Sequence, residues 1–477
     1  MNILRFALPL STVLLLLVPG ERASAQTPAK QLELFKKTAT EPGQALTRMA
    51  GYRNGTAALT KPGIAERADF TATAQYLVNR VTHAEYLLPP DTADLKPKSA
   101  DKTVTKLIAE MKTYLIVPGP DGRLTSGQET YIRELGTAFK DAFGPILIPE
   151  KGKPAAPPII RVNAGRMLAE ACETGAPALW PFVTGLLKSP DTPPEVVFYA
   201  LKSAEGLLGG FDISRLGRLA ATPEESETVF YDLVHTLEIM VEKGPPILGK
   251  LHVDGAAQPT LATDPKSQPA SALVAEQVIA LQLYRLQAIR ALARLRSDVI
   301  AGKVKPGSEV RPVHILARVA IGDPTISPAF NGKEVAEAVI GLTRVNPGPD
   351  LNLDELTYAI ASGTRAVFAP KAGNYEDASL PWKGIAGRMN AALQDWQILV
   401  AKRANAKQKE AIASLLKKAN DGLFVPISNP TAGVGGINPA KLDPLDDWLR
   451  DNKTKGDPLF SDAPAPTPYK LNYPANR

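Results

Sequence analysis

The sequence predicts an all-α protein organised as a helical-repeat (α-solenoid-like) array, with additional N-terminal and C-terminal helices. Apolar residues recur at helical spacing along most of the chain. The 43 prolines and 36 glycines cluster between these apolar segments, so they mark turns. In the middle of the chain, similar helix beginnings recur at a spacing that suits stacked helix pairs.

Residues 1–25 have the layout of a cleavable signal peptide. A basic start ends at Arg5, an apolar stretch runs from Phe6 to Val18, and small residues stand at Ala23-Ser24-Ala25. The apolar stretch is shorter than the ~20 residues that a membrane-spanning helix needs. We therefore expect cleavage between Ala25 and Gln26 and a secreted protein, periplasmic or extracellular. An uncleaved N-terminal anchor is the alternative.

Composition argues against several classes of protein. No segment after the signal is long and apolar enough to span a membrane, and the mean hydropathy is -0.09. A net charge of +6 is too small and too dispersed to indicate a nucleic-acid partner. Cys172 is the only cysteine, so no internal disulfide can form, and its apolar surroundings predict a buried thiol.

An N-terminal helical region is expected over residues 26–150. Ser126 is a candidate N-cap for its last helix, because Glu129 follows at capping-box spacing. The stretch KGKPAAPP at 151–158 cannot continue a helix, so we place a boundary there. The predicted helices lie near residues 30–50, 66–87, 102–116 and 127–143.

A helix, a tight turn and a second helix follow this boundary. IRVNAGRMLAE at 160–170 predicts the first helix, Gly175 the turn, and PALWPFVTGLL at 177–187 the second helix. This unit resembles a HEAT- or armadillo-like helical repeat, in which a central alanine and a leucine pair mark the first helix. The resemblance covers about residues 158–210 and implies antiparallel helix pairs that stack on one another.

The same pattern recurs further along the chain. EVVFYALKSAE at 195–205 puts Ala200 at the place of Ala164, 36 residues later. LQAIRALARL at 286–295 is a further echo, and the resemblance extends weakly over 274–345.

We assign residues 158–300 to HEAT-like repeats, with an insertion at 254–270 that is rich in proline and small residues. The spacing of apolar residues predicts which side chains the helix pairs turn inward. They are Ala164, Leu168, Leu179, Val183, Leu186, Ala200 and Leu207.

A C-terminal helical region is expected over residues 301–452. From Lys453 onwards the chain contains APAPTP and lacks periodicity, so residues 453–477 are predicted to be a proline-rich, extended or mobile tail. The predicted helices lie near residues 333–345, 353–369, 384–402 and 405–419.

Histidine, the commonest general base and metal ligand, is scarce. His83 and His235 lie in predicted helices, whereas His252 and His314 stand near predicted loops and could come together in space. The chain has no Gly-x-Ser-x-Gly elbow, P-loop, His-Glu-x-x-His helix or Cys-x-x-Cys-His haem site. We assign no catalytic residue, no cofactor and no metal ion. An enzyme site assembled from distant residues remains open.

Two acidic motifs favour structure over chemistry. Asp350, Asn352 and Asp354 alternate as in a calcium loop, but Glu355 stands where that loop needs glycine, so a helix cap is favoured. Asp446-Asp447 could serve as paired carboxylates, but adjacent helical residues point about 100° apart, which favours a solvated helix start.

Asn54-Gly55-Thr56 fits a glycosylation acceptor, although Asn-Gly is first of all a turn. Basic side chains gather on one predicted amphipathic helix, beside an apolar stripe from Val274 to Leu295. A solvated basic face is favoured there over a polyanion-binding one, because no aromatic residues are interleaved. The basic residues are Arg285, Arg290, Arg294 and Arg296, and a second, similar set is Lys402, Lys407, Lys409, Lys417 and Lys418.

The leading hypothesis is an exported, noncatalytic helical-repeat protein with a protein-binding or scaffolding role. Stacked helix pairs offer a long surface for a partner, and the expected catalytic motifs are absent. The partner would be another protein or a component of the cell envelope. Two alternatives are a periplasmic or extracellular hydrolase with a non-local active site, and a structural component of the cell envelope.

Overall fold

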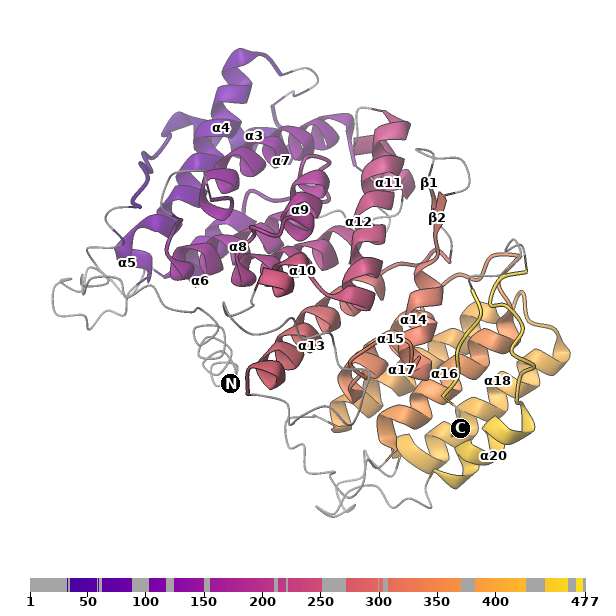
Figure 1. Ribbon diagram of the computed structural model, residues 1–477. Coiled ribbons are helices and arrows are strands. Elements are labelled where there is room, and N and C mark those ends of the chain that lie inside the picture. Colours follow the sequence, from indigo (N-terminus) through magenta and orange to yellow (C-terminus); the bar gives the residue numbers. More distant parts are fainter. Residues whose placement is uncertain are drawn as a thin grey trace. The chain divides into compact units, whose positions relative to one another are not determined.

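The structure is a computed structural model. It describes residues 32, 35–57, 59, 62–87, 103–116, 124–149, 155–209, 213–219, 222–250, 272–298, 300–302, 308–369, 382–425, 442–461 and 469–474. Nearly all regular structure in these residues is helical, which confirms the all-α class (Figure 1). A short antiparallel hairpin joins β1 (Ile300–Gly302) to β2 (Ser308–Val310). The expected signal peptide and the insertion at 254–270 lie outside the described residues.

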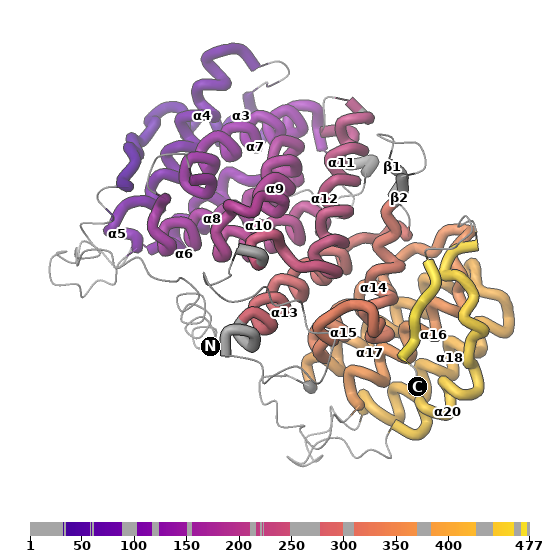
Figure 2. Tube along the Cα trace, in the orientation of Figure 1, coloured from indigo at the N-terminus to yellow at the C-terminus, as the bar shows by residue number. Residues whose placement is uncertain are grey.

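The chain forms two compact units, and each is described by itself. Unit 1 comprises Met1–Thr236 with Pro245–Pro259, and unit 2 comprises Leu237–Gly244 with Thr260–Arg477. Figure 2 follows the chain from the indigo helices of unit 1 to the orange and yellow helices of unit 2. The domain boundaries that the sequence suggests, at 151–158 and at 300, fall inside these units.

Unit 1 begins with α3 and α4 packed on α7. Phe70 of α4 meets Tyr131 of α7 edge to face, with ring centroids 5.4 Å apart. The elements of this part are α3 (Gln44–Asn54), α4 (Ile64–Asn79), the 3-10 turn η1 (Arg80–Thr82), α5 (Ala84–Leu87), α6 (Val104–Lys112) and α7 (Ser126–Leu147).

Two details of the sequence prediction are wrong in this part. The helix expected at 30–50 is interrupted, because residues 36–43 are not helical and α3 begins at Gln44, after Gly43 with its left-handed φ of 54°. The N-cap of α7 is Thr125 instead of Ser126. Its hydroxyl accepts a hydrogen bond from the amide of Gln128 at 3.2 Å, and the Gln128 side chain accepts one from the Thr125 amide at 3.0 Å. A capping box is present as expected, but it starts at the preceding residue.

The first part of the region that was expected to be HEAT-like completes unit 1. All the side chains predicted to face inward between Ala164 and Leu207 are buried, none more than 2% exposed. Gly175 makes the turn after α8 with a φ of 69°. Cys172 is fully buried as predicted, and this burial raises the pKa of its thiol. The helices are α8 (Pro158–Cys172), α9 (Leu179–Lys188), α10 (Pro194–Gly209), α11 (Ile213–Leu219) and α12 (Pro223–Lys243), whose last turns count with unit 2.

α8 and α10 lie side by side and run in the same direction. At their N-terminal ends Arg161 and Glu195 form an ion pair with an N–O distance of 2.5 Å. Towards their C-terminal ends Gly206 lies against the backbone of Ala169. A Cβ on Gly165 would stand 2.7 Å from that of Tyr199, so glycine permits this close approach. α10 also contacts α9, whereas α8 and α9 meet only slightly.

Unit 2 contains two interleaved rows of helices. α13, α15 and α17 contact one another in that order, and so do α14, α16 and α18. A Cβ on Gly341 of α15 would lie 2.8 Å from the Cβ of Ala293, just after α13, so these helices also approach closely. The helices are α13 (Ala272–Leu292), α14 (Pro312–Ile321), α15 (Gly332–Leu342), α16 (Leu353–Phe368), α17 (Trp382–Val400) and α18 (Ala406–Ala419); the π-turn η3 (Asn420–Phe424) and α20 (Asp443–Asp451) follow.

A buried ion pair ties α13 to α15. The side chains of Arg285 and Glu334 are both 0% exposed, and Arg285 Nε donates to Glu334 Oε1 at 2.6 Å. Its Nη1 donates to the Pro328 carbonyl at 2.8 Å, and the guanidinium lies 4.3 Å from the centroid of the Phe330 ring. The expected solvated position of Arg285 is therefore wrong. Its partner lies too far along the sequence for helical spacing to reveal it.

The described part of the C-terminal segment, 453–461 and 469–474, is extended, and it is packed against unit 2. Leu459 and Phe460 are 0% exposed. The Asn352 amide donates to the Leu459 carbonyl at 2.9 Å, and the Tyr473 hydroxyl donates to the buried Glu355 carboxylate at 3.2 Å. Burial raises the pKa of Glu355, against the opposing effect of hydrogen bonds from Thr454 and Tyr473. The segment thus holds the N-terminal end of α16.

We expect Leu168→Ala to lower the free energy of unfolding by about 2–5 kcal/mol, because it removes a side chain buried between helices. Lys188→Ala is the matched control. Its ammonium lies 3.4 Å from Asp232, but both side chains are 49% exposed, so the loss should stay below about 1 kcal/mol. Urea denaturation of the two variants measures both changes. Equally mild effects would contradict the packing described for α8.

Candidate functional site

A groove of about 530 Å³ lies on unit 1, and several of the side chains that line it are charged. α8 contacts both α6 and α10, so one face of α8 is shared between them. On that face Arg166, Ala169 and Glu170 stand at helical spacing, and the small Ala169 leaves room above the helix. The groove is lined by Thr105, Ile108, Ala109 and Lys112 of α6, by Arg166, Ala169 and Glu170 of α8, and by Tyr199 and Lys202 of α10.

Positive charge dominates this groove. Lys112 Nζ lies 2.6 Å from Glu170 Oε2, and this hydrogen bond raises the pKa of Lys112. Arg166 donates to the Asn163 side chain at 3.3 Å, and Lys202 Nζ lies 5.4 Å from the centroid of the Phe198 ring. The groove therefore presents three cationic side chains and a single, already paired carboxylate.

Burial raises the pKa of two side chains in or beside the groove, Tyr199 and Glu173. Burial raises the pKa of the Tyr199 phenol, so the hydroxyl stays protonated and can donate a hydrogen bond. Burial and the charge of Glu170 raise the pKa of Glu173, although Lys112 opposes this. Carbonyl and carboxylate oxygens of a bound segment are the complementary groups for such a surface.

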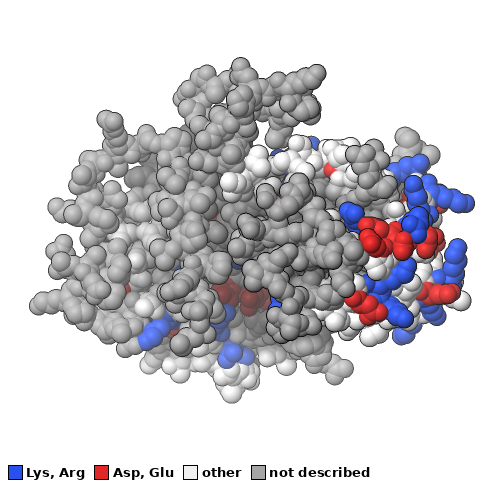
Figure 3. Space-filling model, turned by 90° about the horizontal axis from the view of Figure 1, so that it is seen from below, with Lys and Arg blue, Asp and Glu red and all other residues white. Residues whose placement is uncertain are grey.

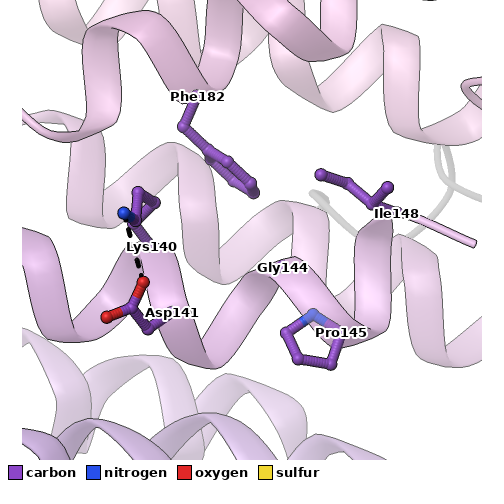
Figure 4. A pocket seen from close by; sticks show the side chains of 6 residues that line it. All are labelled: Lys140, Asp141, Gly144, Pro145, Ile148 and Phe182. Atoms are coloured by element: carbon purple, nitrogen blue, oxygen red, sulfur yellow. Dashed lines mark ion pairs between the residues drawn. The ribbon is translucent and has the colours of Figure 1, made fainter. Parts of the chain in front are cut away.

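A second hollow of unit 1, of about 430 Å³, lies between α7 and α9. Figure 4 shows the Phe182 ring extending from α9 towards α7, where Gly144, Pro145 and Ile148 lie. Ile148 is 48% exposed. At the rim Lys140 Nζ pairs with Asp141 Oδ1 at 3.2 Å (Figure 4). The lining of this hollow is mainly apolar, and Lys140 and Asp141 are its charged residues.

The described histidines have structural partners. His83 Nε2 lies 2.8 Å from the Lys37 carbonyl, and the His235 ring stacks on Tyr231 with centroids 5.7 Å apart. His314 was expected near a loop. It lies instead in the first turn of α14 with its ring edge-on to Tyr469, centroids 5.2 Å apart.

His252 lies outside the described residues. Among the residues that are described, no three His, Cys, Asp or Glu side chains are grouped so as to hold a metal ion. Neither of the two hollows contains a histidine.

The acidic motifs take structural positions. Asn352 caps α16, its side chain accepting from the Asp354 and Glu355 amides at 3.1 and 3.3 Å, as predicted. Asp446 and Asp447 point to different partners: Asp446 accepts from Arg365 at 2.8 Å and Asp447 from Arg450 at 2.7 Å. They do not form a carboxylate pair for acid–base chemistry.

The Asn-Gly turn and the lysine set agree with the structural interpretation. Gly55 ends α3 with a φ of 72°. Lys402, Lys407, Lys409 and Lys417 are exposed, and Lys418 is half-buried. Figure 3 shows basic and acidic side chains intermixed on the side of the view where the C-terminal helices lie in Figure 1. Such mixing is typical of a solvated surface.

Sequence reasoning did not single out the groove. Arg166 and Ala169 were considered only as part of the predicted repeat. Lys112, Tyr199 and Lys202 belong to no recognisable motif. The groove exists because α6 and α10 both contact α8 and flank one of its faces, and neither contact leaves a signal at fixed spacing.

Comparison with protein-family models, with curated proteins and with solved structures finds no significant match for this chain. Within the described residues, no helix combines the length and the apolar character needed to cross a membrane.

His314 should make unit 2 sensitive to acid. Burial and the charge of Arg318 lower its pKa to about 4, so the folded protein binds fewer protons than the unfolded chain below about pH 6.5. The stabilisation by neutral His314 is complete above that pH and is lost as the pH falls towards 4. The loss should approach about 3 kcal/mol. Chemical denaturation at pH 7 and pH 4.5 should show a larger loss for the wild type than for His314→Asn, which cannot titrate. Equal losses would show that other groups account for the acid sensitivity.

Proposed function

We propose that this chain is an exported, noncatalytic helical-repeat protein that binds another protein through the groove between α6, α8 and α10. The groove carries the proposal, because it combines an apolar floor with several cationic groups and a phenol on one helical surface. Such a lining holds an extended segment through its carbonyl and carboxylate oxygens. A component of the cell envelope is the second kind of partner that this surface suits.

The packing of unit 1 supports a repeat. Arg161 with Glu195 and Gly165 with Tyr199 each join positions 34 residues apart. That offset is two residues shorter than the 36 residues that separate Ala164 from Ala200, and it places α8 and α10 side by side in the same direction. Solenoid repeats stack equivalent helices in this way.

The packing of unit 2 supports the same arrangement. Its helices contact their second neighbours along the chain in two rows. The offset between contacting positions of α13 and α15 is 49 residues for Arg285 and Glu334, and 48 for Ala293 and Gly341. Two-helix repeats of the HEAT and armadillo type have periods of about 40–47 residues, with local variation in loop length.

Export is part of the proposal. The tripartite layout of residues 1–25 supports it. Cleavage between Ala25 and Gln26 should leave Gln26 as the first residue of the purified native protein. N-terminal sequencing of protein from the culture medium or periplasm checks this. Met1 on a mature, membrane-retained chain would contradict it.

Site-specific photo-crosslinking tests the groove. A benzoylphenylalanine at Ile108 or Tyr199 should give one discrete adduct with a partner protein, because both side chains line the groove. The same group at Lys188, which is exposed on another helix, is the matched control and should give none.

A charge-reversing variant shows whether the adduct depends on the groove. Lys202→Glu should abolish the adduct at Ile108 and change the thermal midpoint only slightly, since Lys202 is half-buried and forms no ion pair with a described carboxylate. Adducts of equal yield at Lys188 and at the groove positions, or an adduct that survives Lys202→Glu, would overturn this assignment.

A further inference from the structure

Five arginines gather on one side of unit 2, in a group that we call the arginine cluster. Arg290 lies in the last turn of α13, Arg294 and Arg296 follow that helix, Arg344 follows α15, and Arg388 lies on α17. They come from the row α13, α15 and α17, whose members contact one another in order. The cluster therefore crosses three helices that are distant in the sequence.

Glu337 of α15 lies at the centre of this cluster. Its side chain is 9% exposed, and it accepts hydrogen bonds from Arg290 Nε at 3.1 Å and from Arg388 Nη1 and Nη2 at 3.0 and 2.6 Å. Burial alone would raise the pKa of Glu337, but the hydrogen bonds and charges of Arg388 and Arg290 lower it. One ionised carboxylate thus fixes guanidinium groups from the helices on both sides of α15.

The ends of α13 and α15 bring the other arginines close. The Asn346 amide donates to the Arg296 carbonyl at 2.8 Å, which joins the segment after α13 to the segment after α15. Burial, then the charges of Arg294 and Arg388, lower the pKa of Arg344, and Arg296 adds to this. Neither Arg296 nor Arg344 forms an ion pair with a described carboxylate.

Cations at helix C-terminal ends also stabilise the helix dipoles, but that effect is modest. It can explain why each of Arg294, Arg296 and Arg344 is favourable at a helix end. It does not offset the repulsion between their positive charges. Asp298, two residues after Arg296, accepts the Gly348 amide at 2.7 Å and forms no ion pair with Arg296 or Arg344. Arg296 and Arg344 therefore add two positive charges that no described carboxylate pairs with.

We propose that the arginine cluster is a binding site for a phosphate group on a soluble molecule. Planar guanidinium groups form paired hydrogen bonds to phosphate oxygens, and Arg296, Arg344 and Arg388 are exposed to solvent. A carboxylate would supply one negative charge, whereas a phosphomonoester supplies about two, which matches the charges of Arg296 and Arg344. This site is independent of the groove on unit 1.

Isothermal titration of the full mature chain with inorganic pyrophosphate, at constant ionic strength, tests the site. The wild type should bind saturably. The double variant Arg296→Gln/Arg344→Gln should bind roughly tenfold more weakly or worse, because it removes two guanidinium groups that no described carboxylate holds. The charge-retaining Arg296→Lys/Arg344→Lys should be intermediate, since lysine keeps the charge and loses the fork.

Lys409→Gln/Lys417→Gln is the matched control. It removes the same charge from exposed positions of α18 and should leave the affinity within about twofold, as expected for screened surface charges. Equally weakened pyrophosphate binding in this control would show that only the net charge matters. That result would overturn the proposed site. Absence of saturable binding by the wild type would do the same. Binding to vesicles that contain phosphatidic acid, without competition by free pyrophosphate, would overturn the assignment to a soluble ligand.

Discussion

The close approach of helices that are second neighbours along the chain is the constraint on which both units depend. At Gly165 and at Gly341 a Cβ would collide with the facing helix, at distances of 2.7 and 2.8 Å. Backbones this near to one another bury their small residues completely and leave the larger side chains to fill the outer edges. The ion pairs Arg161–Glu195 and Arg285–Glu334 then lie where the aligned helices bring positions of equal height together.

This alignment also determines where polar surface collects. Side chains at equal height on successive helices form rows, so one charged position repeated along a row becomes a patch. The groove on α8 and the arginines around Glu337 arise in this way, each from side chains that are separated by dozens of residues in the sequence. Buried ionic pairs add little net stability, because the cost of desolvation offsets their attraction, but they disfavour shifted registers.

Local signals in the sequence predict the local structure, but they do not predict contacts between helices that are distant in the sequence. The apolar spacing identifies the core positions of α8, α9 and α10, and the Asn352 cap follows from residue type alone. The burial of Arg285 could not be predicted, since its partner Glu334 belongs to another helix and no spacing connects them. The groove and the arginine cluster are missed for the same reason. His314 was expected near a loop and lies in the first turn of α14, but its contact with the distant Tyr469 could not be predicted from spacing.

The solitary thiol of Cys172 has a consequence for quality control. While unit 1 is folded, the sulfur is fully buried and its pKa is raised, so neither alkylating reagents nor oxidants reach a thiolate. Each opening of the α8–α10 interface exposes it for a moment. In an oxidising compartment, two chains that open together would be trapped as a covalent dimer, so the proportion of such dimers would record how often this core has opened during the life of the protein.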